Sequence, residues 1–317
     1  MTRGALKVLT SCAGVCPGES VLIVTDFTTS EFAMPLVSAS MMIGAKPTVI
    51  SMEPRDTDSQ EPPSIVAQAM RDCDVFIALV GRSITHTQAL KDAIATGSRG
   101  LMMTQFVPEM LIEGGIQADF DEIRPICEEM ASLFHEGECL HLVTGDGLQL
   151  TADIRGRRGN ALTARVRSGQ FALIPTVEAN VSPVEGTSRG EVFIDGSIPY
   201  EDIGVLSEPM VLEISDGYVS AIRGGSQASR LRSLLEAKGD HEVYNVAEVG
   251  VGMNPACKMC GLMLEDEGVF GSVHIGIGTS ITLGGSVIAA CHYDLITLRP
   301  TLRIDDRVVI REGEILI

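Results

Sequence analysis

The chain has 317 residues and a mass of 33.8 kDa, a length typical of two domains of about 150 residues each. It carries 24 basic and 42 acidic residues, and the resulting net charge of −18 has the wrong sign for a surface that binds nucleic acid. With 45% hydrophobic and 21% charged residues, the composition excludes a disordered chain and provides for a sizeable core.

The first half of the chain alternates short apolar runs with segments of helical length. The runs expected to be strands are 21–26, 47–52, 74–80 and 100–105. The segments expected to be helices are 29–43, 63–72, 86–96 and 108–136. Continuous apolar strands that alternate with helices indicate a parallel sheet covered on both faces. The sequence therefore predicts an α/β N-terminal domain with a doubly wound parallel sheet, residues 1–140.

The pattern changes at about residue 139. Short alternating runs with Gly, Asp and Ser turns follow, interrupted by one helical segment near 225–237 and closed by a hairpin at the end of the chain. This pattern predicts a mainly antiparallel β (α+β) C-terminal domain, residues 141–317.

The sequence carries no export signal and no motif of the common nucleotide-binding enzymes. Residues 1–18 lack a continuous apolar stretch, so we expect a cytoplasmic protein with reduced cysteines. The first predicted strand is not followed by GxGxxG, and neither a P-loop nor a GxSxG elbow occurs. Cys257 and Cys260 form one isolated CxxC pair. Two ordinary small residues after a turn are a simpler interpretation of this pair than a zinc or redox site.

One stretch without charged residues, 268–293, is long enough to cross a bilayer. Its six glycines and interspersed polar residues instead favour buried strands and turns, and we expect no membrane partner. His274 lies in this stretch, and period-two alternation places it on one strand face with Gly276 and Gly278. The glycines leave space beside the imidazole that could admit a metal, although close backbone packing also explains glycines in a strand.

Three carboxylates stand in comparable apolar or glycine-rich runs. Asp294 follows His292 by two residues, so on a strand both project to the same side about 6.6 Å apart. Glu248 shares a strand face with two glycines, and a buried carboxylate requires a metal, a cation or a proton. Glu178 ends another apolar run, where a solvent-facing loop acid is an equal alternative.

These residues together predict a metal site composed of Glu178, Glu248, His274, His292 and Asp294. The alternative is that the carboxylates accept ordinary hydrogen bonds and that the histidines pack between strands.

The C-terminal half resembles metalloaminopeptidases of the aminopeptidase T and aminopeptidase S type over roughly 140 residues. A PTEE-like segment matches 175–178, a GE strand matches 247–249, an acidic segment at 264–267 leads to the His274 strand, and an HxDF element matches 292–295. The resemblance implies two divalent ions, Zn, Co or Mn, held by the five residues above. It also implies a metal-activated water that cleaves an amide or peptide bond of a small molecule or short peptide. Glu178 is then the expected catalytic proton carrier, with Glu267 as a second candidate.

Two features depart from the aminopeptidase pattern. Ile281 occupies the position of a family tyrosine, seven residues after the strand histidine, and the chain is shorter than the usual member. The resemblance therefore supports the metal site better than it supports peptide cleavage.

The same region is similar to the 2,5-dihydroxypyridine 5,6-dioxygenase family, whose members are non-haem iron enzymes that open a hydroxylated pyridine ring. Residues 249–255 look like its IGWGLQP run, and residues 291–294 look like its CHLD element. Glu248 stands where this family has its first iron-ligating histidine. His274 could restore a two-histidine, one-carboxylate set with His292 and Asp294, which suits one Fe(II) and O₂.

The leading hypothesis from the sequence is thus a metallohydrolase, and the alternative is an Fe(II) ring-cleaving dioxygenase acting on a pyridine-like N-heterocycle. A non-catalytic α/β binding protein is the third. A homodimer is expected from base rates alone.

Overall fold

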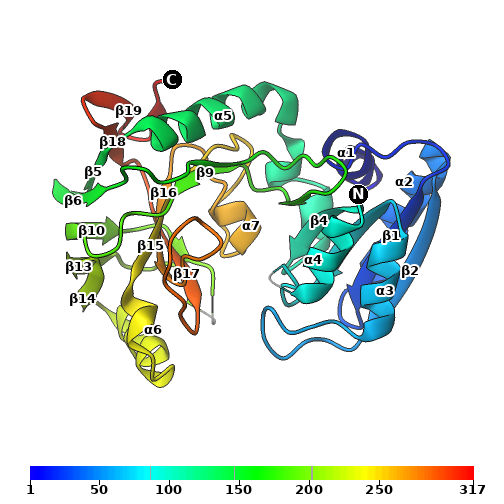
Figure 1. The fold of residues 1–317 in the computed structure, drawn as a ribbon, viewed down its shortest axis with the longest axis horizontal. Coiled ribbons are helices and arrows are strands. Elements are labelled where there is room, and N and C mark those ends of the chain that lie inside the picture. Colours follow the sequence, from blue (N-terminus) through cyan, green and yellow to red (C-terminus); the bar gives the residue numbers. More distant parts are fainter. Residues whose placement is uncertain (86, 146, 201–202) are drawn as a thin grey trace. The chain divides into compact units, whose positions relative to one another are not determined.

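The computed structural model describes residues 1–85, 87–145, 147–200 and 203–317 (Figure 1). Its contacts divide the chain into two compact units, one formed by 1–120 with 162–176 and the other by 121–161 with 177–317. The chain thus leaves the second unit at residue 162, adds a segment to the first, and returns. That residues 1–140 and 141–317 fold as independent domains stays a prediction.

The first unit is built on a five-stranded parallel sheet in the order β2-β1-β3-β4-β8. The strands are β1 (Ser20–Asp26), β2 (Lys46–Met52), β3 (Val75–Val80), β4 (Arg99–Thr104) and β8 (Phe171–Leu173). All six residues of β3 are buried because this central strand is covered on both faces. The doubly wound parallel sheet predicted from the sequence is confirmed.

The helices cover the two faces of this sheet according to the handedness of the connections. The chain runs from β1 to the edge strand β2, and a right-handed crossover places α2 of this connection on one face of the sheet. It then runs in the opposite direction across the sheet, from β2 to β3 and on to β4, so right-handed crossovers place α3 and α4 on the other face. Val66 of α3 and Leu90 of α4 accordingly pack in one buried cluster with Phe76. The helices and helical turns of this unit are α1 (Thr2–Lys7), η1 (Val8–Cys12), η2 (Ser30–Ala33), α2 (Met34–Ile43), α3 (Ser64–Asp72), α4 (Gln88–Ala95), η3 (Pro108–Leu111) and η4 (Gly114–Gln117).

Two predicted elements differ from the structure. The helix expected over 108–136 consists of the turns η3 and η4 followed by α5 (Phe120–Glu136), because Gly114 and Gly115 interrupt the helical pattern. One of the short alternating runs expected to be strands after residue 139, the run 161–169, forms a strand only at its start, in β7 (Asn160–Leu162). For the helix expected over 86–96, the first residue lies outside the described residues.

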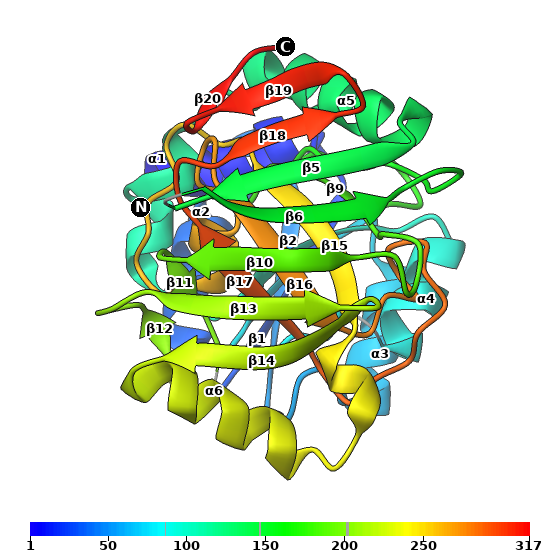
Figure 2. The same ribbon diagram turned by 90° about the vertical axis from the view of Figure 1, so that its left-hand side faces the viewer.

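The second unit contains an eight-stranded antiparallel sheet in the order β14-β13-β10-β6-β5-β18-β19-β20, which faces the viewer in Figure 2. Its strands are β5 (Cys139–Thr144), β6 (Leu148–Asp153), β10 (Arg189–Ile194), β13 (Met210–Ser215), β14 (Tyr218–Gly224), β18 (Thr301–Ile304), β19 (Arg307–Arg311) and β20 (Glu314–Ile315). The hairpin expected at the end of the chain is formed by β18 and β19.

A second sheet of this unit lies behind the first in Figure 2, in the order β17-β16-β15-β9-β7. Its further strands are β9 (Glu178–Val181), β15 (Val246–Gly252), β16 (Val273–Gly278) and β17 (His292–Thr297). The remaining elements are the ribbon β11 (Ser197–Ile198) and β12 (Gly204–Val205), with α6 (Ser226–Ala237), η5 (His241–Tyr244) and α7 (Met263–Asp266). Val249, Ile275 and Leu295 are fully buried on one face of this sheet. The mainly antiparallel β character predicted for the C-terminal part is confirmed.

The uncharged stretch 268–293 forms β16, a long loop and the start of β17. Across the part of the chain that the structure describes, no helix has both the length and the apolar character that crossing a membrane requires.

Candidate metal centre

Polar side chains and glycines alternate between neighbouring strands on one face of the second sheet. The antiparallel register pairs Gly250 of β15 with His274 of β16, and pairs Gly276 of β16 with both Glu248 of β15 and Asp294 of β17. Each ligand-type side chain therefore has a glycine beside it on the adjacent strand. The strand-face pattern inferred from the sequence is present in the structure.

The two glycines provide the space in which the imidazoles stand. A Cβ added at Gly250 would lie 1.9 Å from Nε2 of His274. A Cβ added at Gly276 would lie 2.8 Å from Nε2 of His292 and 2.7 Å from Cβ of Glu248. Real Cβ atoms do not approach other atoms this closely, so only glycine allows this cluster.

All five predicted residues meet in this space. His274 Nε2 lies 3.6 Å from Glu178 Oε2 and 3.6 Å from Glu248 Oε1. His292 Nε2 lies 3.1 Å from Glu248 Oε2 and 3.3 Å from Asp294 Oδ1. Glu178 belongs to strand β9 and is only 6% exposed, so the alternative of a solvent-facing loop acid is wrong.

The ligand atoms fall into two compact groups that share one residue. Glu178, Glu248 and His274 form one group, and Glu248, His292 and Asp294 form the other, with the ligand atoms of each group within 4.8 Å of one another. Glu248 directs Oε1 to the first group and Oε2 to the second. The sequence also suggested that His274, His292 and Asp294 form one iron-binding set. Among the described residues these three do not form a compact group, because His274 lies with Glu178.

Burial and mutual charge shift the pKa values in this cluster strongly. Burial raises the pKa of Glu178 to about 7. Burial works against the charged form of His274, but Glu178 and Glu248 outweigh it and raise the imidazole pKa to about 9. Burial likewise opposes ionisation of Glu248, but hydrogen bonds from the two histidines hold its pKa below the usual value. Positive charge is thus stabilised at this position, as expected of a cation site.

The sequence did not indicate two residues that bind the outer carboxylates of the cluster, which are Glu178 and Asp294 on either side of the shared Glu248. Asn180 donates from Nδ2 to Glu178 Oε1 at 3.0 Å, and the hydroxyl of Tyr200 donates to Asp294 Oδ2 at 3.1 Å. Asn180 follows Glu178 by two residues on the same strand, so period two alone could have indicated it. Tyr200 follows the ribbon strand β11 and no sequence pattern links it to Asp294.

The residues present fit a divalent metal. Glu178 Oε2 and Asp294 Oδ1 are buried atoms without a hydrogen-bond partner in the described parts of the chain, and both face an imidazole nitrogen of the cluster. Buried carboxylate oxygens without donors are costly unless a cation binds them. Carboxylate oxygens and imidazole nitrogens are ligands that suit Fe, Mn and Zn.

Comparison with known proteins decides the family. The model of the NicX family, described as 2,5-dihydroxypyridine 5,6-dioxygenase, matches residues 1–317. The chain belongs to the 2,5-dihydroxypyridine 5,6-dioxygenase family. The 2,5-dihydroxypyridine 5,6-dioxygenase of Pseudomonas putida (strain KT2440) is 26% identical over 246 residues, which cover 74% of this chain and 69% of that protein.

Two solved structures share the fold of this dioxygenase family member. The structure of the 2,5-dihydroxypyridine dioxygenase from Pseudomonas putida KT2440 superposes with a TM-score of 0.83 at 18% identity, over 99% of this chain and 96% of the other. Wild-type AmpT from Thermus thermophilus superposes with a TM-score of 0.71 at 15% identity, over 100% and 98%. At these identities both likenesses show the fold alone. The dioxygenase alternative is therefore better supported than the leading hydrolase hypothesis, for which the AmpT likeness supplies no activity.

The CxxC pair lies outside the cluster of this dioxygenase family member. Burial, followed by the charge of Glu265, raises the pKa of Cys257 well above its usual value, and burial raises that of Cys260 to about 11. These thiols are therefore poor thiolate ligands. All eight cysteines are free of disulfide bonds.

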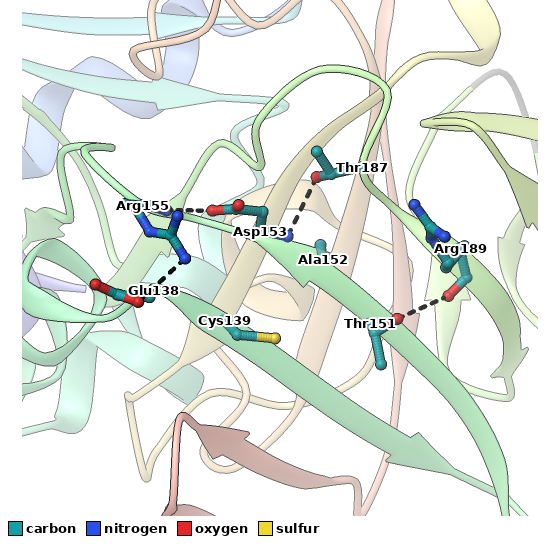
Figure 3. A pocket seen from close by; sticks show the side chains of 8 residues that line it. All are labelled: Glu138, Cys139, Thr151, Ala152, Asp153, Arg155, Thr187 and Arg189. Atoms are coloured by element: carbon teal, nitrogen blue, oxygen red, sulfur yellow. Dashed lines mark hydrogen bonds and ion pairs between the residues drawn. The ribbon is translucent and has the colours of Figure 1, made fainter.

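A pocket of about 340 Å³ lies on the eight-stranded sheet, apart from the predicted residues (Figure 3). It is lined by Glu138, Cys139, Thr151, Ala152, Asp153, Arg155, Thr187 and Arg189. Arg155 Nη2 lies 3.1 Å from Glu138 Oε2, and the Arg155 backbone N–H donates to Asp153 Oδ1 at 2.8 Å. These contacts are typical of a solvated sheet surface, so we assign the chemistry to the cluster around Glu248.

Proposed function

We propose that the protein is a non-haem Fe(II) dioxygenase that opens the ring of a hydroxylated, pyridine-like N-heterocycle. The observation that carries the proposal is the match of the dioxygenase family model to the whole chain. The buried cluster on β9, β15, β16 and β17 supports it, because it supplies carboxylate and imidazole donors at one place.

Glu248, His292 and Asp294 would hold the iron. His292 Nε2 lies 3.1 Å from Glu248 Oε2 and 3.3 Å from Asp294 Oδ1, so the three ligand-type atoms are close enough to bind one ion together. Bound Fe(II) supplies the capacity to bind and reduce O₂. This ligand set has one imidazole and two carboxylates, and Glu248 adds a negative charge where the resemblance implies a histidine.

Glu178 is the residue we propose to move a proton. Its pKa of about 7 means that it exchanges a proton readily near neutral pH, as a general base for a substrate hydroxyl must. Asn180 holds its Oε1, and Oε2 faces the cluster.

The loop beside the cluster suits an uncharged substrate. The loop 279–291 between β16 and β17 has no acidic or basic residue. The Thr279 carbonyl of this loop lies 2.8 Å from His292 Nδ1, and Ile281, which replaces the aminopeptidase tyrosine, is half exposed. An uncharged segment beside buried ligands favours a small neutral ring over a charged peptide terminus.

One observation favours a second candidate function, a binuclear metallohydrolase. Glu248 is shared between two three-residue groups, and a carboxylate that directs one oxygen to each of two sites is typical of a bridging ligand. Such an enzyme would hold two Zn, Co or Mn ions and cleave an amide or peptide bond of a small substrate.

Metal content and oxygen uptake separate the two proposals. Protein purified without chelator and reconstituted anaerobically with Fe(II) should hold about one iron per chain and consume O₂ with a dihydroxypyridine. The variant Glu248→Gln should lose both properties. The matched control is Glu242→Gln, which changes an acid that accepts a hydrogen bond from the Tyr218 hydroxyl, and it should keep both. Two Zn, Co or Mn per chain, with aminoacyl hydrolysis and no oxygen uptake, would replace the dioxygenase by the hydrolase.

A further inference from the structure

The two outer carboxylates of the cluster are bound in the same way by neutral donors. Asp294 places Oδ2 on the Tyr200 hydroxyl at 3.1 Å and Oδ1 3.3 Å from His292 Nε2. Glu178 places Oε1 on Asn180 at 3.0 Å and Oε2 3.6 Å from His274 Nε2. In each carboxylate, the oxygen that faces the imidazole is the buried one without a hydrogen-bond partner in the described residues.

The Tyr200 side chain is held against the strand that carries two of the ligands. Its ring packs on the ring of Tyr293, with centroids 5.1 Å apart and an interplanar angle of 42°. Tyr293 lies between His292 and Asp294 in β17, and the ribbon strand β11 just before Tyr200 contacts β17. The same hydroxyl also lies 3.3 Å from Glu267 Oε1. Ring packing of this kind keeps the hydroxyl beside these two carboxylates, and the shorter of its two contacts is the one to Asp294.

A neutral donor that binds one oxygen of a carboxylate sets the direction in which the second oxygen of that carboxylate points. A hydrogen bond to Oδ2 fixes the rotation of the carboxylate about its last bond, and it leaves the lone pairs of Oδ1 available in the direction of the cluster. A phenol does this without adding a cationic side chain that would compete with a metal for the carboxylate.

We infer that Tyr200 is a positioning residue that orients Asp294 for metal binding. Asn180 holds Glu178 by the same kind of bond and fixes the direction in which its second oxygen faces the cluster. The inference rests on the metal centre of the proposed function but not on the reaction performed there. Neither residue belongs to the two groups of ligand-type side chains, and each acts through the carboxylate that it binds.

The test compares Tyr200→Phe with Tyr218→Phe. Tyr218 donates to Glu242 Oε2 at 2.9 Å, so its variant loses the same kind of bond, a phenol hydroxyl to a carboxylate, away from the cluster. Three quantities are measured for the full chain: the affinity for Fe(II) and for Zn²⁺ by competition with a chelating dye, the electron paramagnetic resonance spectrum of the Fe(II)–nitric oxide complex, and the thermal midpoint of the metal-free protein.

We expect Tyr200→Phe to weaken metal affinity by about 10- to 100-fold, the usual effect of removing such an outer hydrogen bond. Its nitric oxide spectrum should broaden, because Asp294 is no longer held in one orientation. Tyr218→Phe should change the affinity by less than about twofold, and the metal-free midpoints of the two variants should agree.

The inference is overturned if Tyr200→Phe binds both metals as tightly as the control does, or if its only change is a lower thermal midpoint. A wild-type protein that binds Zn²⁺ but neither Fe(II) nor O₂ would refute the proposed dioxygenase, while the Zn²⁺ affinities of the two variants would still decide the role of Tyr200. A wild-type protein that binds no metal would refute both.

Discussion

Gly250 of β15 lies directly across the ladder from His274 of β16, and a methyl group on Gly250 would reach within 1.9 Å of the imidazole Nε2. The imidazole of His274 therefore occupies space that any other residue at position 250 would fill. This relationship makes the candidate metal cluster sensitive to substitution of glycines whose only contribution is the space beside the ligands.

Gly250→Ala should displace His274 and, through Glu248, which both groups share, weaken metal binding. Overpacking of this kind also lowers the free energy of unfolding by about 1–3 kcal/mol. The companion variant Gly276→Ala should affect the other group, since its Cβ would meet His292 and Glu248. Metal titration by calorimetry and chemical denaturation measure both effects, and unchanged metal content in both variants would contradict the arrangement described.

Glu178→Gln separates a proton carrier from a metal ligand. If iron is held by Glu248, His292 and Asp294, the variant should retain iron and lose about 10²- to 10⁴-fold in turnover, the usual contribution of general acid–base catalysis. Steady-state oxygen uptake and iron analysis on the same preparation provide the measurement. Loss of iron in parallel with activity would instead make Glu178 a ligand.

The stability of the metal-free protein should fall as the pH rises from about 5 to 9. The folded-state pKa of Glu178 is raised to about 7 and that of His274 to about 9, so the folded chain binds protons more tightly than the unfolded chain. Stabilisation from a raised pKa is complete below the unfolded value and disappears as the pH passes the folded value. Thermal midpoints at several pH values, measured in chelator, give the slope, and a midpoint that rises over this range would show the opposite linkage.

Metal affinity should change with pH in the opposite direction. A divalent ion must displace protons from the imidazoles, so binding should strengthen between pH 6 and 9 and release protons. Calorimetric titrations in two buffers of different ionisation enthalpy count the protons released. His141→Ala, which removes a histidine that contacts Gln149 on the other sheet, should leave that number unchanged.

The sequence by itself determined the α/β layer of the first unit, the antiparallel character of the second and the five residues of the candidate metal cluster. Apolar runs of strand length alternate with helical segments in 21–105. Period two places Glu248 and His274 on strand faces with glycines, and places Asp294 on the same face as His292. These signals are local, since they depend only on residues a few positions apart.

Tertiary structure decided how the ligands are divided and what holds them. Register across β9, β15, β16 and β17 placed His274 with Glu178 and placed His292 with Asp294, leaving Glu248 between them. Tyr200 reaches Asp294 from 94 residues away in the chain, and β8 joins the first sheet after an excursion into the second unit. Pairings of this kind depend on which strands become neighbours, and the free energy that selects neighbours comes from burying whole sheet faces, which no short window of sequence contains.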